Sequence, residues 1–182
     1  MSTSIIKIIP EQANRAEVYK QIETIFFQTS SVQQFASDQA RDSFKDRWLT
    51  PYLTSQKSEN LYSVWVAMDE STVVGYLTGH AQTALFRQVH DHLSLSLFAD
   101  LHDDYPAHLH INMAPNQQGK GLGASLISAY MQELQSHKIC GVHLVTGPKA
   151  RNTGFYRRQG FNAEYIRNGG GVDLLFMGQK LD

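Results

Sequence analysis

Cysteine is almost absent from this sequence: Cys140 is the single cysteine among 182 residues. One cysteine excludes an internal disulfide, and there is no cysteine cluster that could hold zinc. The neighbours of Cys140 in the sequence are mostly apolar, which favours a small core residue over a catalytic nucleophile.

Charge and long apolar runs are also scarce. Charged residues make up 18% of the chain and the net charge is -1, so there is no bulk attraction to nucleic acid or to an anionic membrane. No apolar run approaches the length of a membrane span, and the N-terminus lacks the apolar stretch of a signal peptide. We therefore expect a cytoplasmic protein. With 42% hydrophobic residues, the chain suits one globular domain over residues 1–182.

The most informative stretch runs from residue 108 to residue 134. Side chains alternate between polar and apolar over 108–113, which is typical of a strand with two different faces, and Pro115 ends it because proline has no N–H to donate. A glycine-rich turn, Gln118-Gly-Lys-Gly-Leu-Gly123, follows, and apolar residues then recur at helical spacing as far as Leu134. The pattern predicts a strand, a glycine turn and a helix.

This arrangement suits an anion. The first amides of a helix have no intrahelical acceptor, and the peptide dipoles add partial positive charge there. Gly119, Gly121 and Gly123 would let a phosphate approach the backbone closely. Two better-known phosphate loops fit badly, because Lys120 does not stand in a P-loop pattern and the glycines are spaced G-x-G-x-G rather than G-x-G-x-x-G.

In the rest of the chain, the sequence pattern predicts strands and helices on both sides of this stretch. We expect strands over 4–10, 61–68, 72–80, 107–113 and 142–146, a terminal hairpin over 161–166 and 172–180, and helices over 11–29, 40–53, 121–137 and 151–159. A long connection over 81–107 would carry a short helix near 94–101. Strand 107–113, helix 121–137 and strand 142–146 form a β-α-β unit whose two strands should be parallel.

Three segments resemble the GNAT superfamily of N-acetyltransferases. Gln118-Gly-Lys-Gly-Leu-Gly123 resembles its Q/R-x-x-G-x-G/A acyl-CoA signature, and Ile111-Asn-Met-Ala-Pro115 resembles the strand end that precedes it. Phe155-Tyr-Arg-Arg-Gln-Gly-Phe161 resembles the F-Y-x-x-x-G-F segment. Tyr105-Pro-Ala-His-Leu-His-Ile111 and Gly141-Val-His-Leu144 are similar to bacterial relatives of the O-GlcNAcase acetyltransferase-like domain.

The resemblance implies an α/β GNAT fold, with a mixed, mostly antiparallel sheet flanked by helices and a parallel β-α-β unit at the cofactor cleft. Acetyl-CoA would lie between the strands ending at Met113 and Thr146. Main-chain amides would bind the diphosphate, the acetyl carbonyl and the pantetheine arm. The implied cofactor-binding residues are Ile111, Asn112, Met113, Gln118, Gly119, Lys120, Gly121, Leu122, Gly123, Ala124, Asn152, Phe155, Tyr156 and Arg158.

The same resemblance gives Tyr156 the role of the acid that protonates the departing thiolate, with a packed aromatic residue as the alternative. Many relatives have asparagine about seven residues earlier, where this chain has Lys149; Asn152 lies nearer. Lys120 would either contact a phosphate or be solvated, and so would Arg158.

For the general base, histidine's pKa of ~6.5 suits neutral pH. His108 and His110 share one strand face, and His110 lies closer to the expected thioester. Either could instead be a hydrogen-bonded core histidine. Asp91 and Asp104 in the long connection are alternatives, as acceptor-binding groups.

We therefore predict an acetyl-CoA-dependent N-acetyltransferase in which a primary amine attacks the thioester directly. No metal is expected, since the eight histidines show no strong ligand spacing. The acceptor would be a small molecule or a peptide amine, with no nucleic-acid or membrane partner, and the protein a monomer or homodimer. The main alternative is a non-catalytic acyl-CoA-binding domain. Transfer of another acyl group and binding of a nucleotide or phosphometabolite without CoA are further alternatives.

Overall fold

The structure, a computed structural model, describes residues 3–9, 11–54 and 61–181. Pro10, which we expected to close the first strand, lies outside the described residues. The strands are β1 (Thr3–Lys7), β2 (Tyr62–Asp69), β3 (Thr72–His80), β4 (Ala107–Met113), β5 (Gly141–Thr146), β6 (Ala163–Gly169) and β7 (Val172–Lys180). The helices are α1 (Arg15–Thr29), α2 (Asp38–Trp48), α3 (Thr50–Thr54), α4 (Thr83–Arg87), α5 (Leu93–Ser96), α6 (Leu122–Ser136) and α7 (Thr153–Arg158), with 3-10 turns η1 (Ala99–Leu101) and η2 (Pro115–Gln117).

In the described part of the chain the strands form one seven-stranded sheet in the order β1-β2-β3-β4-β5-β7-β6. β4 and β5 are parallel, with Ala107 opposite Val142 and His108 opposite His143. Antiparallel pairing joins β1 to β2, β5 to β7 and β6 to β7. The predicted β-α-β unit and terminal hairpin are confirmed, and the fold is the expected mixed α/β arrangement.

The chain divides into two compact units. The first unit comprises Met1–Gly79 and His110–Tyr130, and the second comprises His80–Leu109 and Met131–Asp182. The chain therefore passes from one unit to the other inside β4 and again inside α6. Each unit buries side chains of its own, and each contains part of the motifs that the sequence singles out.

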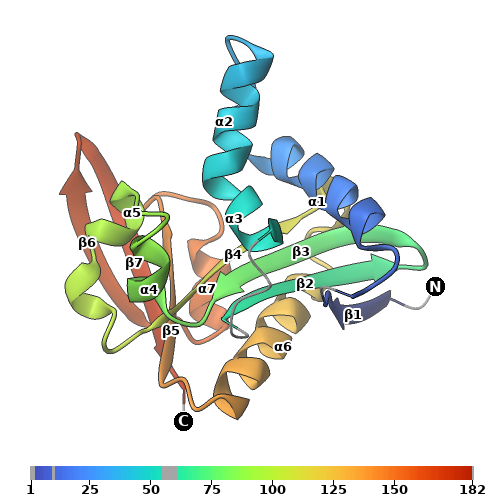
Figure 1. The fold of residues 1–182 in the computed structure, drawn as a ribbon. Helices are drawn as coiled ribbons and strands as arrows, with labels where there is room; N and C mark the ends of the chain where they lie inside the picture. Colours follow the sequence, from blue (N-terminus) through green and yellow to red (C-terminus); the bar gives the residue numbers. More distant parts are fainter. Residues whose placement is uncertain (1–2, 10, 55–60, 182) are drawn as a thin grey trace. The chain divides into compact units, whose positions relative to one another are not determined.

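In the first unit, α1 lies along β2 and β3 (Figure 1). Its apolar side chains recur every three to four residues, so one face of the helix can pack on the strands. The helix begins at Arg15 rather than at Glu11. Its first helical hydrogen bond runs from the N–H of Val18 to the carbonyl of Asn14 at 3.1 Å. The buried core of this unit is formed by Ile8, Val18, Ile22, Ile25, Phe26, Leu49, Val64, Val66, Met68, Val73 and Tyr76.

Helices α2 and α3 replace the single helical segment that we expected over 40–53. The hydroxyl of Ser37 caps α2 by accepting the N–H of Ala40 at 3.1 Å. The helix breaks at Leu49, whose φ of -125° is not helical. Pro51 lies in the first turn of α3, where an N–H is not needed. The predicted disruption near Pro51 is confirmed, but it falls two residues earlier.

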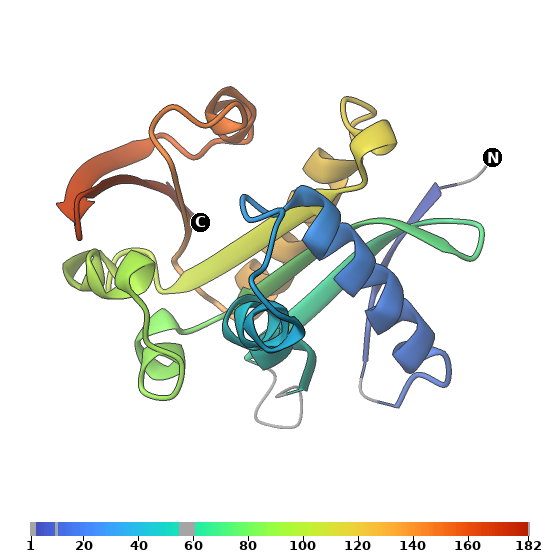
Figure 2. The same ribbon diagram turned by 90° about the horizontal axis from the view of Figure 1, so that it is seen from above.

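In the second unit, the connection between β3 and β4 folds into α4, α5 and η1, where we expected one short helix. Figure 2 shows these segments beside the β6–β7 hairpin. A methyl group at Gly169 would meet Leu93 at 3.0 Å and Leu97 at 3.2 Å, so both leucines pack closely against the end of β6 at the hairpin turn. Arg167 also donates to the carbonyl of Leu97 at 2.8 Å. Each helical segment is too short to show a helical period in the sequence.

The expectation that Cys140 is a core residue is wrong, because its side chain is exposed. Gly141 occupies the crowded position instead: a Cβ there would collide with the carbonyl oxygen of Asp104 and lie 3.1 Å from the Cα of Tyr105. Strand β5 begins at this glycine, and the apolar side chains that follow it, Val142 and Leu144, are buried.

Candidate active site

The glycine turn and the part of β4 that begins at His110 lie in the first unit. Strand β4 is fully buried over 107–109 and half-buried over 110–113, so it becomes accessible toward its C-terminal end. After β4, the N–H of Ala114 donates to the carbonyl of Val74 at 3.0 Å, and η2 turns the chain toward α6. The predicted end of the strand before Pro115 is confirmed.

Two glycines of the turn have backbone conformations that favour glycine. Gly119 has a φ of +77° and Gly121 a φ of +82°, and a methyl group on either would meet nothing within 4 Å. Helix α6 begins at Leu122, with the N–H of Ser125 bonded to the carbonyl of Gly121 at 3.2 Å. The backbone at the start of α6 is therefore open to a ligand, and the first amides of a helix attract an anion.

Lys120 is exposed within this turn, and its ammonium donates to Oε1 of Gln117 at 2.8 Å. The lysine side chain is thus bonded to a neutral side chain that lies just before the turn. Gln118 is also exposed, whereas Leu122, Gly123 and Ala124 are half-buried.

The polar face of β4 in the first unit meets two tyrosines that the sequence did not single out. Asn112 donates from Nδ2 to the hydroxyl of Tyr76 at 2.9 Å, and burial raises the pKa of that phenol. The His110 ring packs edge-on against Tyr52, with 5.6 Å between the ring centroids. Burial, with Tyr62 nearby, also raises the pKa of Tyr52 well above its ordinary value. Both tyrosines therefore stay neutral, and the ring that packs on His110 is uncharged.

Met113 lies on the other face of β4, against β3. A Cβ on Gly75 would collide with the side chain of Met113 and lie 3.2 Å from the carbonyl oxygen of Asn112. The glycine in β3 thus allows Met113 to lie across the neighbouring strand. Tyr52, Gly75 and Tyr76 are far from β4 in the sequence, so no local pattern could have identified them.

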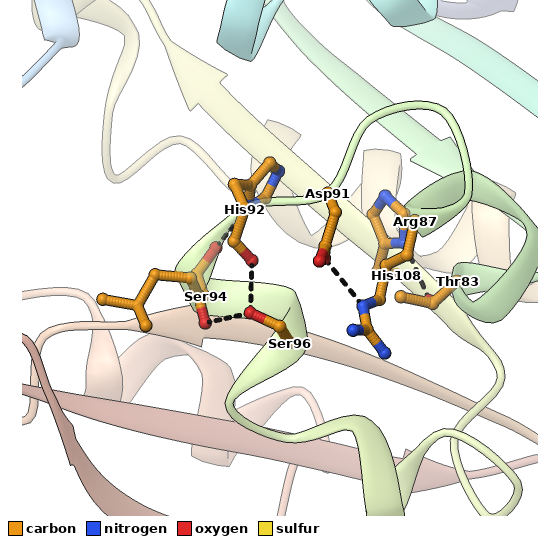
Figure 3. A network of polar contacts seen from close by, with 8 residues as sticks. Thr83, Arg87, Asp91, His92, Ser94, Ser96 and His108 are labelled. Atoms are coloured by element: carbon orange, nitrogen blue, oxygen red, sulfur yellow. Dashed lines mark hydrogen bonds and ion pairs between the residues drawn. The ribbon is translucent and has the colours of Figure 1, made fainter.

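His108 belongs to the second unit and is 1% exposed. Its Nδ1 lies 2.8 Å from the hydroxyl of Thr83, which also donates to the carbonyl of Pro106 at 2.8 Å. Figure 3 shows Thr83 beside His108, and the ion pair between Arg87 and Asp91 at 2.8 Å. His108 is therefore the hydrogen-bonded core histidine that the sequence left open as an alternative.

We expect Thr83→Val to lower the free energy of unfolding by about 1–3 kcal/mol, because valine removes the oxygen that faces a buried imidazole nitrogen. Urea denaturation followed by circular dichroism would measure the change. Thr24→Val is the matched control: the Thr24 hydroxyl donates only to its own helix, in an exposed position, and the change should stay within about 0.5 kcal/mol. Equal midpoints for Thr83→Val and the wild type would contradict this role.

The second motif residue, Tyr156, lies on α7 in the second unit and is 5% exposed. Nδ2 of Asn152 donates to its hydroxyl at 3.3 Å. Burial raises the pKa of Tyr156 to about 12, an effect that the hydrogen bond from Asn152 only partly offsets. Phe155 packs on the tyrosine ring at 5.3 Å between centroids. Gly160 ends the segment with a φ of +98°, as expected of a residue that follows a helix.

The other charged residues considered in the sequence are either exposed or bound in ion pairs. Arg158 is exposed, as is Lys149. Arg157 forms a two-point ion pair with Glu164, at 2.6 Å and 3.0 Å. Asp104, an alternative for acceptor binding, pairs with Lys180 at 2.5 Å, and Asp91 pairs with Arg87. Both carboxylates therefore already have cationic partners.

The predicted site residues are thus divided between the units. The first unit contains His110, Ile111, Asn112, Met113 and 118–124. The second unit contains His108, Asn152, Phe155, Tyr156 and Arg158.

Among residues 3–9, 11–54 and 61–181, no group of three or more His, Cys, Asp or Glu side chains is placed to hold a metal ion. Within those same ranges, no helix is long and apolar enough to cross a membrane.

Comparison with known proteins bears on the family and the fold. The sequence model of the Acetyltransferase (GNAT) family matches residues 29–161. The fold is similar to that of SsHAT, with 21% identity, a TM-score of 0.70 and full coverage of both chains. It is also similar to the PaiA N-acetyltransferase from Thermoplasma acidophilum in complex with coenzyme A, with 14% identity, a TM-score of 0.64 and 99% of each chain covered. A third similar structure is yncA from Salmonella typhimurium with its cofactor acetyl-CoA, with 18% identity, a TM-score of 0.58, and coverage of 100% of this chain and 95% of that one.

The family match spans well over half of the chain, and the protein belongs to the Acetyltransferase (GNAT) family.

Proposed function

We propose that this protein is an acetyl-CoA-dependent N-acetyltransferase that transfers the acetyl group to a primary amine. The observation that carries the proposal is the turn at Gly119 and Gly121, whose backbone is open where α6 begins. Related folds bind the same ligand type: the structure from Thermoplasma acidophilum contains coenzyme A, and yncA contains acetyl-CoA. We further propose that residues 1–182 act as one acetyltransferase domain.

The proposed cofactor contacts are mainly backbone groups. The amides of 118–124 would bind the diphosphate, and those of Ile111 and Met113 the acetyl carbonyl and pantetheine arm. The amide aimed at the carbonyl would also stabilise the oxyanion that forms when the amine attacks, a contribution of roughly 3 kcal/mol per donor. Asn112, Phe155 and Arg158 complete the proposed contacts. Asn152 would act through the Tyr156 hydroxyl, to which it donates.

Tyr156 is the proposed acid. Its raised pKa of about 12 keeps the phenol protonated at neutral pH, so a proton is always available. The same high value makes the proton hard to release to a thiolate with a pKa of ~8.5. We therefore propose that the phenol donates a hydrogen bond to the developing thiolate and so stabilises the leaving group. The thiolate is protonated afterwards, by exchange with solvent.

His110 is the proposed base in preference to His108, because Nδ1 of His108 already faces Thr83 in a buried site. We expect His110→Gln to lower kcat/KM by roughly 10²- to 10⁴-fold and to abolish the acidic limb of its pH profile. His137→Gln is the matched control, since His137 is exposed at the end of α6, and it should keep both. An unchanged acidic limb in His110→Gln would assign that limb to another group.

The experiment that tests the proposed function is a thiol-release assay with acetyl-CoA and a panel of amines. The panel should include amino sugars, polyamines, lysine and peptides with free N-termini, with the acetylated product identified by mass spectrometry. Thiol release that requires one class of amine would support acetyl transfer and identify the acceptor. Tight binding of acetyl-CoA by calorimetry, with no product from any amine, would instead favour a non-catalytic acyl-CoA-binding domain.

The second candidate is a non-catalytic acyl-CoA-binding domain. The burial that raises the pKa of Tyr156 to about 12 favours it, because such a phenol is a weak acid for the leaving thiolate. The resemblance of Tyr105–Ile111 and Gly141–Leu144 to bacterial relatives of the O-GlcNAcase acetyltransferase-like domain remains a prediction that bears on this choice. We propose further that the protein acts in the cytoplasm, on a small-molecule or peptide amine, as a monomer or homodimer.

A further inference from the structure

A row of buried imidazoles runs through the second unit. The rings of His80 and His108 stack at 6.0 Å between centroids, His108 and His143 lie at 5.9 Å, and His143 and His102 stack at 5.1 Å. The four residues, which we name the histidine column, are at most 4% exposed. They account for half of the eight histidines in the chain. Neutral imidazoles can stack in this way, whereas charged ones at these distances would repel each other.

The hydrogen bonds of the column fasten both ends of the connection over 81–106. At its start, the N–H of Gln82 donates to Nδ1 of His80 at 3.0 Å, and Thr83 contacts His108. At its end, Nδ1 of His143 lies 2.8 Å from the carbonyl of Tyr105. The N–H of Thr83 also donates to the carbonyl of Pro106 at 2.6 Å, which ties the two ends to each other. The helices α4, α5 and η1 lie between these ends.

For two members of the column, the partner of Nδ1 assigns the proton on the ring. A carbonyl can only accept, so His143 carries its proton on Nδ1. The Thr83 hydroxyl can either donate to Nδ1 of His108 or accept from it, so this contact does not assign the proton on His108. His80 is the reverse case of His143: its Nδ1 accepts an N–H and therefore carries no proton when the ring is neutral. Nε2 is its protonated nitrogen.

This difference makes His80 the sensitive member of the column. A second proton on His143 would go to Nε2 and leave the Nδ1 hydrogen bond in place. A second proton on His80 must go to Nδ1, the atom that accepts the N–H of Gln82. Two donors would then face each other, and that bond would be lost.

The groups around His80 add to the effect. His108 faces it from β4, and His90 faces it from the segment after α4, while Phe86 of α4 packs on its ring at 5.3 Å. Burial lowers the pKa of His80 to about 4; the backbone of Gln82 partly offsets this effect, and His90 adds to it. Farther along the column, burial likewise lowers the pKa of His102 to about 4; its charged neighbours are Arg87, Asp100, Asp103 and Asp91. Both rings are therefore neutral at pH 7.

We propose that His80 is an acid-sensitive latch that holds the start of the 81–106 connection and releases it when its Nδ1 takes up a proton. The sign follows from the lowered pKa. The latch is fully closed above the ordinary histidine pKa of ~6.5, and its contribution is lost as the pH falls toward about 4. The device would loosen the second unit in acid while the first unit keeps its structure.

Hydrogen exchange of the full chain tests the latch. Asn is the informative replacement, because its Oδ1 is attached to Cγ as Nδ1 is in histidine, accepts an N–H, and does not titrate. In the wild type, the protection factors of the Gln82 and Thr83 amides should fall by up to about tenfold per pH unit below the midpoint, after correction for intrinsic exchange. His80→Asn should keep its protection through this range, and the control His137→Asn should respond like the wild type.

Two results would overturn the proposal: loss of protection in His80→Asn at the wild-type pH, or full protection of the wild type down to about pH 4. Trp48 and Trp65 both lie in the first unit, so a simultaneous change in their emission would indicate global unfolding and also overturn it. Should His80→Asn fail to fold, the ¹⁵N chemical shift of Nδ1 of His80 in the wild type tests the proposal instead. It must change from an unprotonated to a protonated value at the midpoint of the loss of protection.

Discussion

Gly121→Ala is expected to weaken acetyl-CoA binding at least tenfold while the protein stays folded. The methyl group would meet no protein atom within 4 Å, so it would project into the open space at the start of α6. If the diphosphate binds there, its oxygens must approach main-chain N–H groups to hydrogen-bond distance, and a Cβ interferes with that approach. Isothermal calorimetry with acetyl-CoA would measure the change in Kd.

Gly171→Ala provides a matched control for the strain at a positive φ. Gly171 has a φ of +80°, against +82° for Gly121, and a methyl group there also meets nothing within 4 Å. Both substitutions should therefore cost the same small amount of stability, of about 1 kcal/mol. Only Gly121→Ala should lose affinity. Equal affinities for the two variants would mean that the turn does not bind the diphosphate.

The sequence predicts most accurately where one local pattern determines one element. Strand β4 spans Ala107–Met113, as expected, and α6 begins and ends within one residue of the predicted helix, because alternation and helical spacing are both long and regular there. The connection over 81–107 shows the opposite case. Its short helices are held by contacts with residues far away in the sequence, such as Leu93 with Gly169, and no local period marks them.

The candidate site shows the same division. Alternation correctly placed His108 and His110 on one face of β4, yet it could not tell them apart. Their roles are separated by distant partners: Thr83 of α4 for His108, and Tyr52 of α3 for His110. Cys140 was misplaced for a related reason, since its apolar neighbours suggested burial while the close contact with the chain before β4 falls on Gly141. Local patterns thus identify a face, and only tertiary contacts determine which residue on it is buried.

Tyr156→Phe is expected to lower kcat by roughly 10²-fold or more, with little change in Kd for acetyl-CoA. The ring is buried against Phe155 and Phe161, so phenylalanine can occupy the same space. What is lost is the hydroxyl, which would interact with sulfur only as the thioester breaks. The effect should therefore appear in turnover and not in cofactor binding. Stopped-flow assays of thiol release, with calorimetry for Kd, would separate the two quantities.

The reaction with a better leaving group distinguishes a proton donor from a packing residue. A thioester whose thiol has a lower pKa needs less help in departing, so Tyr156→Phe should lose less activity with such a substrate than with acetyl-CoA. Tyr105→Phe is the control, because Tyr105 is another tyrosine of the second unit, 8% exposed and packed on Phe176. It should match the wild type with both thioesters. An equal loss with both thioesters in Tyr156→Phe would assign the tyrosine to packing, because a structural defect does not depend on the pKa of the departing thiol.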